Sequence, residues 1–236
     1  MQPPKSCRIE SFMSNWKNNY RSFYYEHAPE PDDIVLNRDS SALLVIDIQN
    51  TYLEPDDNPK EALRWKPFYK RMNNTVIPNT ADMISWAREC GLEVIFARIA
   101  CLKKDGKDRS LSQKKPGFNY LLMPTDSEES QIIEELSPQA DEISITKTTD
   151  SALTGTNLRL TLHNMGIKSV IVTGIFTDQC VSSTVRSLAD ESFEVLVVED
   201  CCAAATDEIH LQELKIINMI YCHVLQAEEV KQLLAS

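Results

Sequence analysis

The segment SVIVTGIFTDQCVSSTVRSLADESFEVLVV (169–198) decides the fold of this chain. It opens with the apolar run 169–173 and closes with a second one, 193–198, and each is typical of a strand buried on both faces. Residues 178–191 lie between them, and their apolar side chains have helical spacing. Because two parallel strands need a crossover connection, usually a helix, the segment predicts a βαβ unit and hence a parallel sheet.

The same alternation of strands and helices continues on both sides of this segment. We expect further strands over 42–46, 92–99 and 142–146, helices over 78–90, 127–136, 156–165 and 208–223, and a short strand and helix within 225–234. Gly91 and Gly166 are well placed to end two of these helices. The pattern predicts one α/β domain, residues 41–236, in which helices cover both faces of a central parallel sheet.

Residues 1–40 have a different character, because they are polar but rich in aromatic side chains. These aromatic residues are Phe12, Trp16, Tyr20, Phe23, Tyr24 and Tyr25. We interpret the segment as an N-terminal arm that packs on the body or on a neighbouring subunit. Exposed aromatic side chains on an extension usually find a partner surface, so we expect a homo-oligomer, either a dimer or a tetramer.

Composition narrows the function classes. The chain has 236 residues and a net charge of −11, which speaks against non-specific binding to nucleic acid. It has neither a long apolar run typical of a membrane span nor an apolar signal-peptide core, so we expect a cytoplasmic protein that does not bind membranes. The seven cysteines are irregularly spaced and include no C-x-x-C pair, which argues against a zinc ribbon or a dithiol redox site.

Three chemically able side chains fall at the carboxyl ends of predicted strands, where ligands bind in such sheets. Asp47 ends the first strand, Lys147 follows the strand at 142–146, and Cys180 follows Gly174 at the start of a helix. Asp47 could accept the thiol proton, Lys147 could stabilise the thiolate, and helix N–H groups could hold a developing oxyanion. Each residue also has a structural interpretation: Asp47 as a cap, Lys147 as a solvated loop residue and Cys180 as a packed thiol.

Three segments together resemble the isochorismatase-like cysteine hydrolase family. They are ALLVIDIQNTYL (42–53), ITKTTDSALTGTNLRLTL (145–162) and VIVTGIFTDQCVSSTVRSLADESFEVLVVEDCCAA (170–204). The resemblance covers roughly residues 40–230 and implies a three-layer, Rossmann-like α/β/α fold with Asp47, Lys147 and Cys180 as the catalytic triad. It also implies a cis peptide at Ile175-Phe176, and backbone N–H groups at Phe176 and Cys180 that form an oxyanion hole.

The chain departs from one branch of that family. The nicotinamidase branch carries a metal site with an Asp-x-His pair after the second strand, but FARIACLKKDGKDRSLSQ (96–113) contains no histidine. We therefore predict no metal and no other cofactor. The presence of Cys180 favours hydrolysis of a C–N bond in a small amide, ureide or carbamoyl substrate. Isochorismatase-type vinyl-ether hydrolysis, a non-catalytic binding protein on the same fold and a redox thiol remain as alternatives.

Substrate contacts are harder to predict. Gln49 could hydrogen-bond the substrate or position Asp47, and Arg98, at the end of the second strand, could clamp a carboxylate. Trp65 and Phe176 could wall a small pocket. The segment 103–115 has six basic and two acidic residues, and it is either a loop that steers an anionic substrate or a solvated loop.

Overall fold

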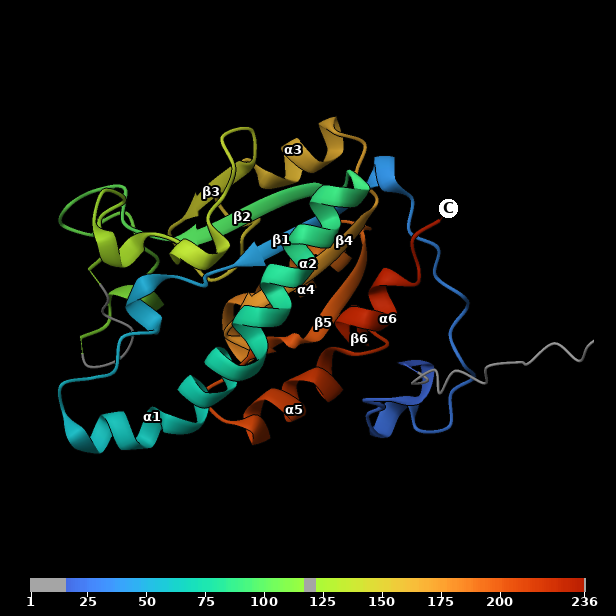
Figure 1. Ribbon diagram of the computed structural model, residues 1–236, viewed down its shortest axis with the longest axis horizontal. Coiled ribbons are helices and arrows are strands. Elements are labelled where there is room, and N and C mark those ends of the chain that lie inside the picture. Colours follow the sequence, from blue (N-terminus) through green and yellow to red (C-terminus); the bar gives the residue numbers. More distant parts are fainter. Residues whose placement is uncertain (1–15, 117–121, 236) are drawn as a thin grey trace, which may run out of the picture.

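The computed structural model describes residues 16–116 and 122–235, and its centre is an all-parallel sheet (Figure 1). The strands are β1 (Ser41–Ile46), β2 (Glu93–Ile99), β3 (Ile143–Lys147), β4 (Ser169–Ile175), β5 (Glu194–Ala203) and β6 (His223–Leu225). Their order across the sheet is β3-β2-β1-β4-β5-β6, and each neighbouring pair is parallel. The strand order therefore reverses between β1 and β4, which is the place where such sheets open a crevice for ligands.

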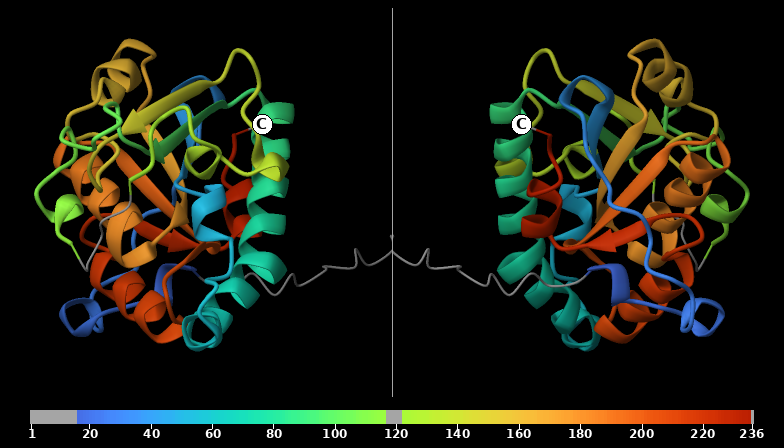
Figure 2. Two further views of the ribbon diagram at one scale, coloured as in Figure 1. Left: turned by 90° about the vertical axis from the view of Figure 1, so that its left-hand side faces the viewer. Right: turned by 90° about the vertical axis from the view of Figure 1, so that its right-hand side faces the viewer.

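Helices cover both faces of this sheet, so the predicted three-layer α/β/α fold is confirmed (Figure 2). They are α1 (Pro59–Arg71), α2 (Ile77–Cys90), α3 (Leu158–Asn164), α4 (Ser182–Asp190), α5 (Asp207–Ile217) and α6 (Ala227–Lys231). Helices α2 and α6 pack on one face in one apolar cluster, and α3, α4 and α5 contribute to a second cluster on the other. Helix α1 runs out past the carboxyl ends of the strands, where it borders the site described below.

Burial explains the sequence pattern of the central strands. All six residues of β1 and all seven of β4 are buried, because each strand has a neighbour on both sides and helices above and below. Helix α2 ends at Gly91, whose backbone is left-handed, with φ of 73°. An L side chain is strained in that conformation, so glycine is suited to this position.

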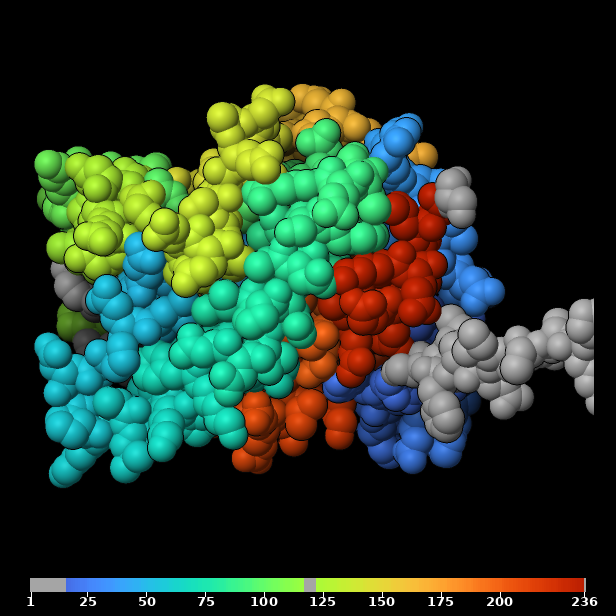
Figure 3. Space-filling model, in the orientation of Figure 1, coloured from blue at the N-terminus to red at the C-terminus, as the bar shows by residue number. Residues whose placement is uncertain are grey.

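The described part of the arm, residues 16–40, packs against the C-terminal end of the chain. The Trp16 and His223 rings are 5.2 Å apart, and the backbone of Leu36 exchanges hydrogen bonds with residues 233 and 235. In Figure 3 the C-terminal segment in turn lies against α2, where Lys231 pairs with Asp82. Phe23 and Tyr24 stay exposed, and oligomerisation remains a prediction.

Two predicted helices differ from the structure. Residues 127–136 form two short 3-10 turns, Glu128–Ser130 and Glu134–Leu136, in place of one helix. Backbone groups between the turns pair with the loop after β1 (Asn50 N–H to Gln131 O, and Ile133 N–H to Ile48 O), so a continuous helix cannot form. Helix α5 ends at Ile217, earlier than predicted, because Asn218 has an extended backbone. Its side-chain amide donates to backbone carbonyls of the arm and accepts from the N–H of residue 224.

Strand β5 also runs past its predicted end at Val198. Its register against β4 shifts between Val172 and Gly174, so that Cys202 becomes the partner of Gly174. Glu199 and Asp200 therefore lie in an irregular part of the strand, where their side chains can reach the neighbouring helices. Asp200 accepts hydrogen bonds from the Asn79 side chain and the Ala227 N–H.

Gly174 lies where the backbones of β1 and β4 approach closely. Its φ is 124°, and a Cβ atom built there would be 2.0 Å from the carbonyl oxygen of Ile46. Any larger residue would therefore push apart the two strands that lead to Asp47 and to Cys180. Gly166 is a useful contrast, because its φ of 72° is also positive but a Cβ would meet nothing within 4 Å.

Replacement of these two glycines separates backbone strain from close approach. We expect Gly166→Ala to lower the free energy of unfolding by about 1–2 kcal/mol, the cost of the left-handed conformation alone. Gly174→Ala adds the collision with β1 and should cost roughly 3 kcal/mol or more. Urea denaturation of both variants measures the difference, and equal losses would contradict the close approach of the two strands.

Candidate active site

The ends of β1, β3 and β4 bring Asp47, Lys147 and Cys180 into contact. Lys147 Nζ is 2.7 Å from Asp47 Oδ2 and 3.3 Å from Cys180 Sγ, and it also donates to the carbonyl of Thr149. Lys147 is fully buried, and Asp47 and Cys180 are 2 % and 6 % exposed. The ammonium group therefore bridges the carboxylate and the sulfur, with its long side chain reaching past β2 from the third strand.

The local backbone geometry at Asp47 and at Cys180 places both side chains at the site. Asp47 has a positive φ of 54°, and its N–H donates to the Ala97 carbonyl, which turns the chain sharply as it leaves β1. Residues Thr177–Val181 form a single π-helical turn ahead of α4, and Cys180 lies in it. The predicted helix at 178–191 thus begins with one wider turn ahead of α4.

The peptide bond Ile175–Phe176 is cis, and Phe176 leads directly into the π-helical turn. The Gln179 and Val181 N–H groups both donate to the Phe176 carbonyl, which closes the turn. The assignment of an oxyanion hole to Phe176 and Cys180 stays a prediction.

Burial and charge set the protonation of the three groups. Burial raises the pKa of Asp47 against the opposing effects of Lys147 and Cys180. Burial lowers the pKa of Lys147, but the charges of Asp47 and Cys180 outweigh it and hold that pKa above its ordinary value. Burial, together with the charge of Asp47, raises the pKa of Cys180 well above its ordinary value, while Lys147 opposes them. The raised pKa values favour a protonated thiol and a charged Lys147, which pairs with Asp47 at 2.7 Å.

A cavity of about 420 Å³ opens above Cys180. One side is an aromatic wall, which comprises Tyr52, Trp65, Phe68, Tyr69 and Phe176. The Phe176 ring is central to it, since its centroid is 5.1 Å from that of Phe68 and 5.5 Å from that of Tyr52. Trp65 and Phe176 thus lie where the sequence analysis placed them, with α1 supplying much of the wall.

Gln49 and Arg98, the two predicted polar contacts to substrate, are placed elsewhere by the structure. The Gln49 carboxamide is buried and bonds to the backbone of Ile99 and Ser130. Arg98 donates to the Thr125 and Ser130 carbonyls, and neither side chain lines the cavity. Carbonyl groups of the irregular segment 123–133, which runs beside both residues, need donors and take up these side chains. The structure therefore gives no support to the substrate contacts predicted for Gln49 and Arg98.

The basic segment 103–115 lies beside the site but contributes little to its lining. Gln113 is the residue of this segment that faces the cavity. Arg109 is buried and donates to the Gln113 side chain. Lys103, Lys104 and Lys115 are exposed to solvent.

Asp150 was missed by the sequence analysis. It lines the cavity, and its Oδ1 is 3.8 Å from Cys180 Sγ and accepts a hydrogen bond from the Gln113 side chain. Its position three residues after Lys147, beyond the end of a strand, is a signal that could have indicated it. Tyr52 was missed as well, and burial, with the neighbouring charge of Asp47, raises its pKa well above the ordinary value.

Comparison with known proteins assigns the chain to a family. The model of the isochorismatase domain matches residues 41–229, and the chain belongs to the isochorismatase family, a family of hydrolases. A probable inactive nicotinamidase of Arabidopsis thaliana is 27 % identical over 175 residues, which are 72 % of this chain and 84 % of that protein.

Solved structures show the same fold. An isochorismatase family protein from Burkholderia thailandensis has a TM-score of 0.70 and 26 % identity, over 86 % of this chain and 98 % of that one. An N-carbamoylsarcosine amidase from Thermoplasma acidophilum has a TM-score of 0.62 and 22 % identity, over 80 % of this chain and 97 % of that one.

Within residues 16–116 and 122–235, no cluster of three or more His, Cys, Asp or Glu side chains is arranged to hold a metal ion, and the metal-free site remains a prediction. None of the helices there is long and apolar enough to cross a bilayer.

The charge balance around the thiol predicts opposite effects of two substitutions. Asp47→Asn removes a negative charge and should lower the pKa of Cys180, whereas Lys147→Met removes a positive charge and should raise it. We expect each midpoint to move by roughly one pH unit or more, equivalent to about 1.4 kcal/mol. The pH dependence of Cys180 alkylation by iodoacetamide, followed by mass spectrometry of the peptide, measures both. Shifts in the same direction would contradict this assignment of charges.

Proposed function

We propose that the protein is a cysteine hydrolase that cleaves a C–N bond of a small amide, ureide or carbamoyl compound. The observation that carries the proposal is the buried chain Asp47–Lys147–Cys180 at the floor of a cavity. A thiol with no chemical role has no need of a buried ammonium group at 3.3 Å. One structural neighbour is named an amidase, so this fold is compatible with C–N hydrolysis.

The proposed reaction has two halves. Asp47 takes the thiol proton as Cys180 Sγ attacks the substrate carbonyl carbon, and Lys147 stays charged beside the thiolate. When the tetrahedral intermediate collapses, the C–N bond breaks and the proton on Asp47 goes to the leaving nitrogen. Asp47 then accepts a proton from water as the water oxygen attacks the thioester. The C–S bond breaks, the acid departs, and the proton returns to Cys180.

Vinyl-ether hydrolysis is the second candidate on this fold. It would use Asp47 as the acid and leave Cys180 a bystander. The contact between Lys147 and Cys180 favours the thiol mechanism, because it ties the sulfur to the same charge network as the acid. A non-catalytic binding protein on the same fold is the third hypothesis. It would give the contacts among Asp47, Lys147 and Cys180 no role.

The charge of the cavity favours a neutral or positively charged substrate. Its carboxylates are Asp47, Glu54, Asp56 and Asp150, and no Lys, Arg or His is among the described residues that line it. Lys147 lies behind the lining and offsets Asp47, and Arg109 lies behind Gln113. Aromatic faces beside carboxylates attract cations, so this site disfavours the anionic substrate that Arg98 was expected to bind.

Ammonia release from a panel of small amides, ureides and carbamoyl compounds tests the mechanism. Cys180→Ala and Cys180→Ser should each lower kcat at least about 1,000-fold, because the nucleophile acts as one unit with its base. Cys222→Ala is the matched control, since this buried thiol lies outside the cavity and should leave kcat unchanged. Turnover that survives Cys180→Ala would refute the thiol mechanism, and cleavage of isochorismate by that variant would support the vinyl-ether reading.

A matched series of amides tests the charge preference. Three substrates on one scaffold, with an ammonium, a methyl or a carboxylate group at the same distance from the amide, should differ in kcat/KM. We expect the cation to exceed the anion by about tenfold or more, equivalent to 1.4 kcal/mol. The variant Glu54→Gln/Asp56→Asn should narrow that difference and leave the methyl compound unaffected. A preference for the anion would contradict this reading of the cavity.

A further inference from the structure

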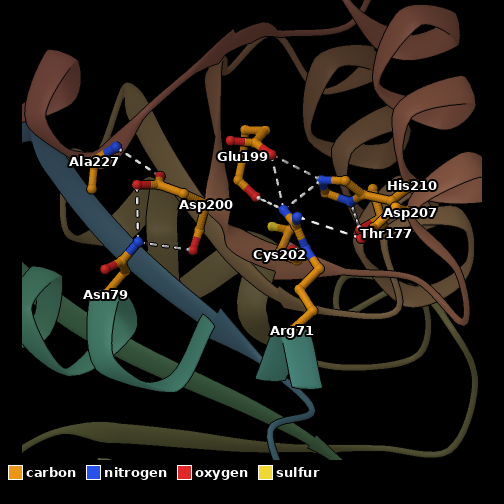
Figure 4. A network of polar contacts seen from close by, with 9 residues as sticks. All are labelled: Arg71, Asn79, Thr177, Glu199, Asp200, Cys202, Asp207, His210 and Ala227. Atoms are coloured by element: carbon orange, nitrogen blue, oxygen red, sulfur yellow. Dashed lines mark hydrogen bonds and ion pairs between the residues drawn. The ribbon is translucent and has the colours of Figure 1, made fainter. Parts of the chain in front are cut away.

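A partly buried polar network joins the C-terminal end of α1 to β5, α5 and Thr177 (Figure 4). Arg71, the last residue of α1, donates from Nε to the Cys202 carbonyl and from its terminal nitrogen to the carbonyl and side chain of Glu199. The same nitrogen is 2.9 Å from His210 Nε2, on the first turn of α5. The irregular stretch of β5 and the ends of two helices thus meet at one guanidinium group.

The network reaches the nucleophile turn through one contact. His210 Nδ1 is 2.7 Å from the hydroxyl of Thr177, and both residues are fully buried. Thr177 is the first residue of the π-helical turn and lies between Phe176, on the cavity wall, and Cys180. A side chain at this position can fix where the turn begins and therefore where the sulfur lies.

The contacts of His210 decide which ring nitrogen carries the proton. Arg71 can only donate, so we assign Nε2, at 2.9 Å from its terminal nitrogen, as the acceptor. The two hydrogens of that nitrogen are then shared among Nε2, the Glu199 carbonyl and Glu199 Oε1. The more distant Glu199 Oε1, at 3.4 Å, is better placed to accept from Arg71, whose nitrogen is 2.9 Å away. Nδ1 therefore carries the hydrogen and donates to the Thr177 hydroxyl. Burial lowers the pKa of His210, which keeps the ring neutral in this arrangement.

We propose that His210 is a positioning residue that holds the nucleophile turn through Thr177, and that Arg71 fixes the His210 ring and couples the turn to α1. The coupling has a clear geometric basis, because α1 also carries Trp65, Phe68 and Tyr69 of the aromatic wall. One arginine at the end of that helix thereby ties the wall that receives substrate to the turn that carries the nucleophile. The inference goes beyond the proposed function, and its kinetic readout rests on that function.

A neighbouring network offers a matched control. Asn79 on α2 donates to Asp200, and Asp200 accepts from the Ala227 N–H, so this network joins the same strand to α2 and α6 (Figure 4). None of these three residues contacts the nucleophile turn through a hydrogen bond in the described structure. Asn79→Ala therefore tests whether loss of any polar anchor on β5 disturbs the site.

Two substitutions of His210 separate its two contacts. Asn can place a nitrogen near the position of Nδ1 and keep the donor to Thr177, whereas Gln can place an oxygen near Nε2 and keep only the acceptor for Arg71. Thr177→Val removes the hydroxyl at nearly constant volume. We expect His210→Gln and Thr177→Val to lower kcat about 10- to 100-fold with little change in KM, since an ångström of misplacement can cost about 100-fold.

His210→Asn should stay within about fivefold of the wild type, and Asn79→Ala should keep its kcat. The double variant Thr177→Val/His210→Gln should be no slower than the worse single variant, because both remove the same contact. The alkylation rate of Cys180 at fixed pH, which needs no substrate, is the second readout and should follow the order of kcat. Circular dichroism confirms that each variant is folded.

The outcomes are distinct. Folded His210→Gln and Thr177→Val proteins with wild-type kcat and alkylation rate would overturn the proposal. Equal losses in His210→Asn and His210→Gln would also overturn it, because they would assign the effect to packing and not to the Thr177 contact. If the wild type hydrolyses no C–N substrate, the proposed function fails, and the alkylation rates still decide whether His210 positions the turn.

Discussion

The ion pair between Asp47 and Lys147 is the constraint on which the site depends. Both groups are buried, and taking two charges out of water costs several kcal/mol per ion unless each compensates the other. Losing either partner would leave an uncompensated charge worth about 3–5 kcal/mol. The strands that carry the pair, β1 and β3, are separated by β2, so the pair forms only when the sheet is assembled in the right order. The contact between these two side chains therefore depends on the correct order of strands in the sheet.

The same ion pair also contacts the Cys180 thiol through Lys147. Cys180 arrives from β4 on the other side of β1, at the point where the strand order reverses, and there it meets an ammonium already held by Asp47. The close approach of Gly174 to Ile46 lets the two strand ends converge. A carboxylate, an ammonium and a thiol thus come from three separate stretches of chain, and no local sequence segment contains the site.

Much of this could be predicted because strand ends in a parallel sheet share an edge. That rule placed Asp47, Lys147 and Cys180 at one edge but left a structural interpretation open for each. Their assignment as a catalytic triad came from the resemblance to a hydrolase family. Arg98 shows its limit, because side chains alternate along a strand and the adjacent Ile99, on the opposite face, is the one that lines the cavity. The Gln49 side chain instead donates to the backbone of the irregular segment 123–133. No periodic sequence pattern reveals the path of that segment. The bulge of β5 likewise breaks the period-two pattern that would have shown where Glu199 and Asp200 point.

The aromatic wall and Cys180 are held in place by different parts of the structure. The sheet fixes Cys180 from below, but α1 lies beyond the strand ends and has few core contacts of its own, with Phe68 its one fully buried side chain in the described structure. Such a helix needs an anchor if its aromatic side chains are to keep their distance from the sulfur. Arg71 supplies it at the C-terminal end, where four acceptors on β5 and α5 converge on one guanidinium group. Changes of specificity can arise on the outer turns of α1 without disturbing the ion pair beneath.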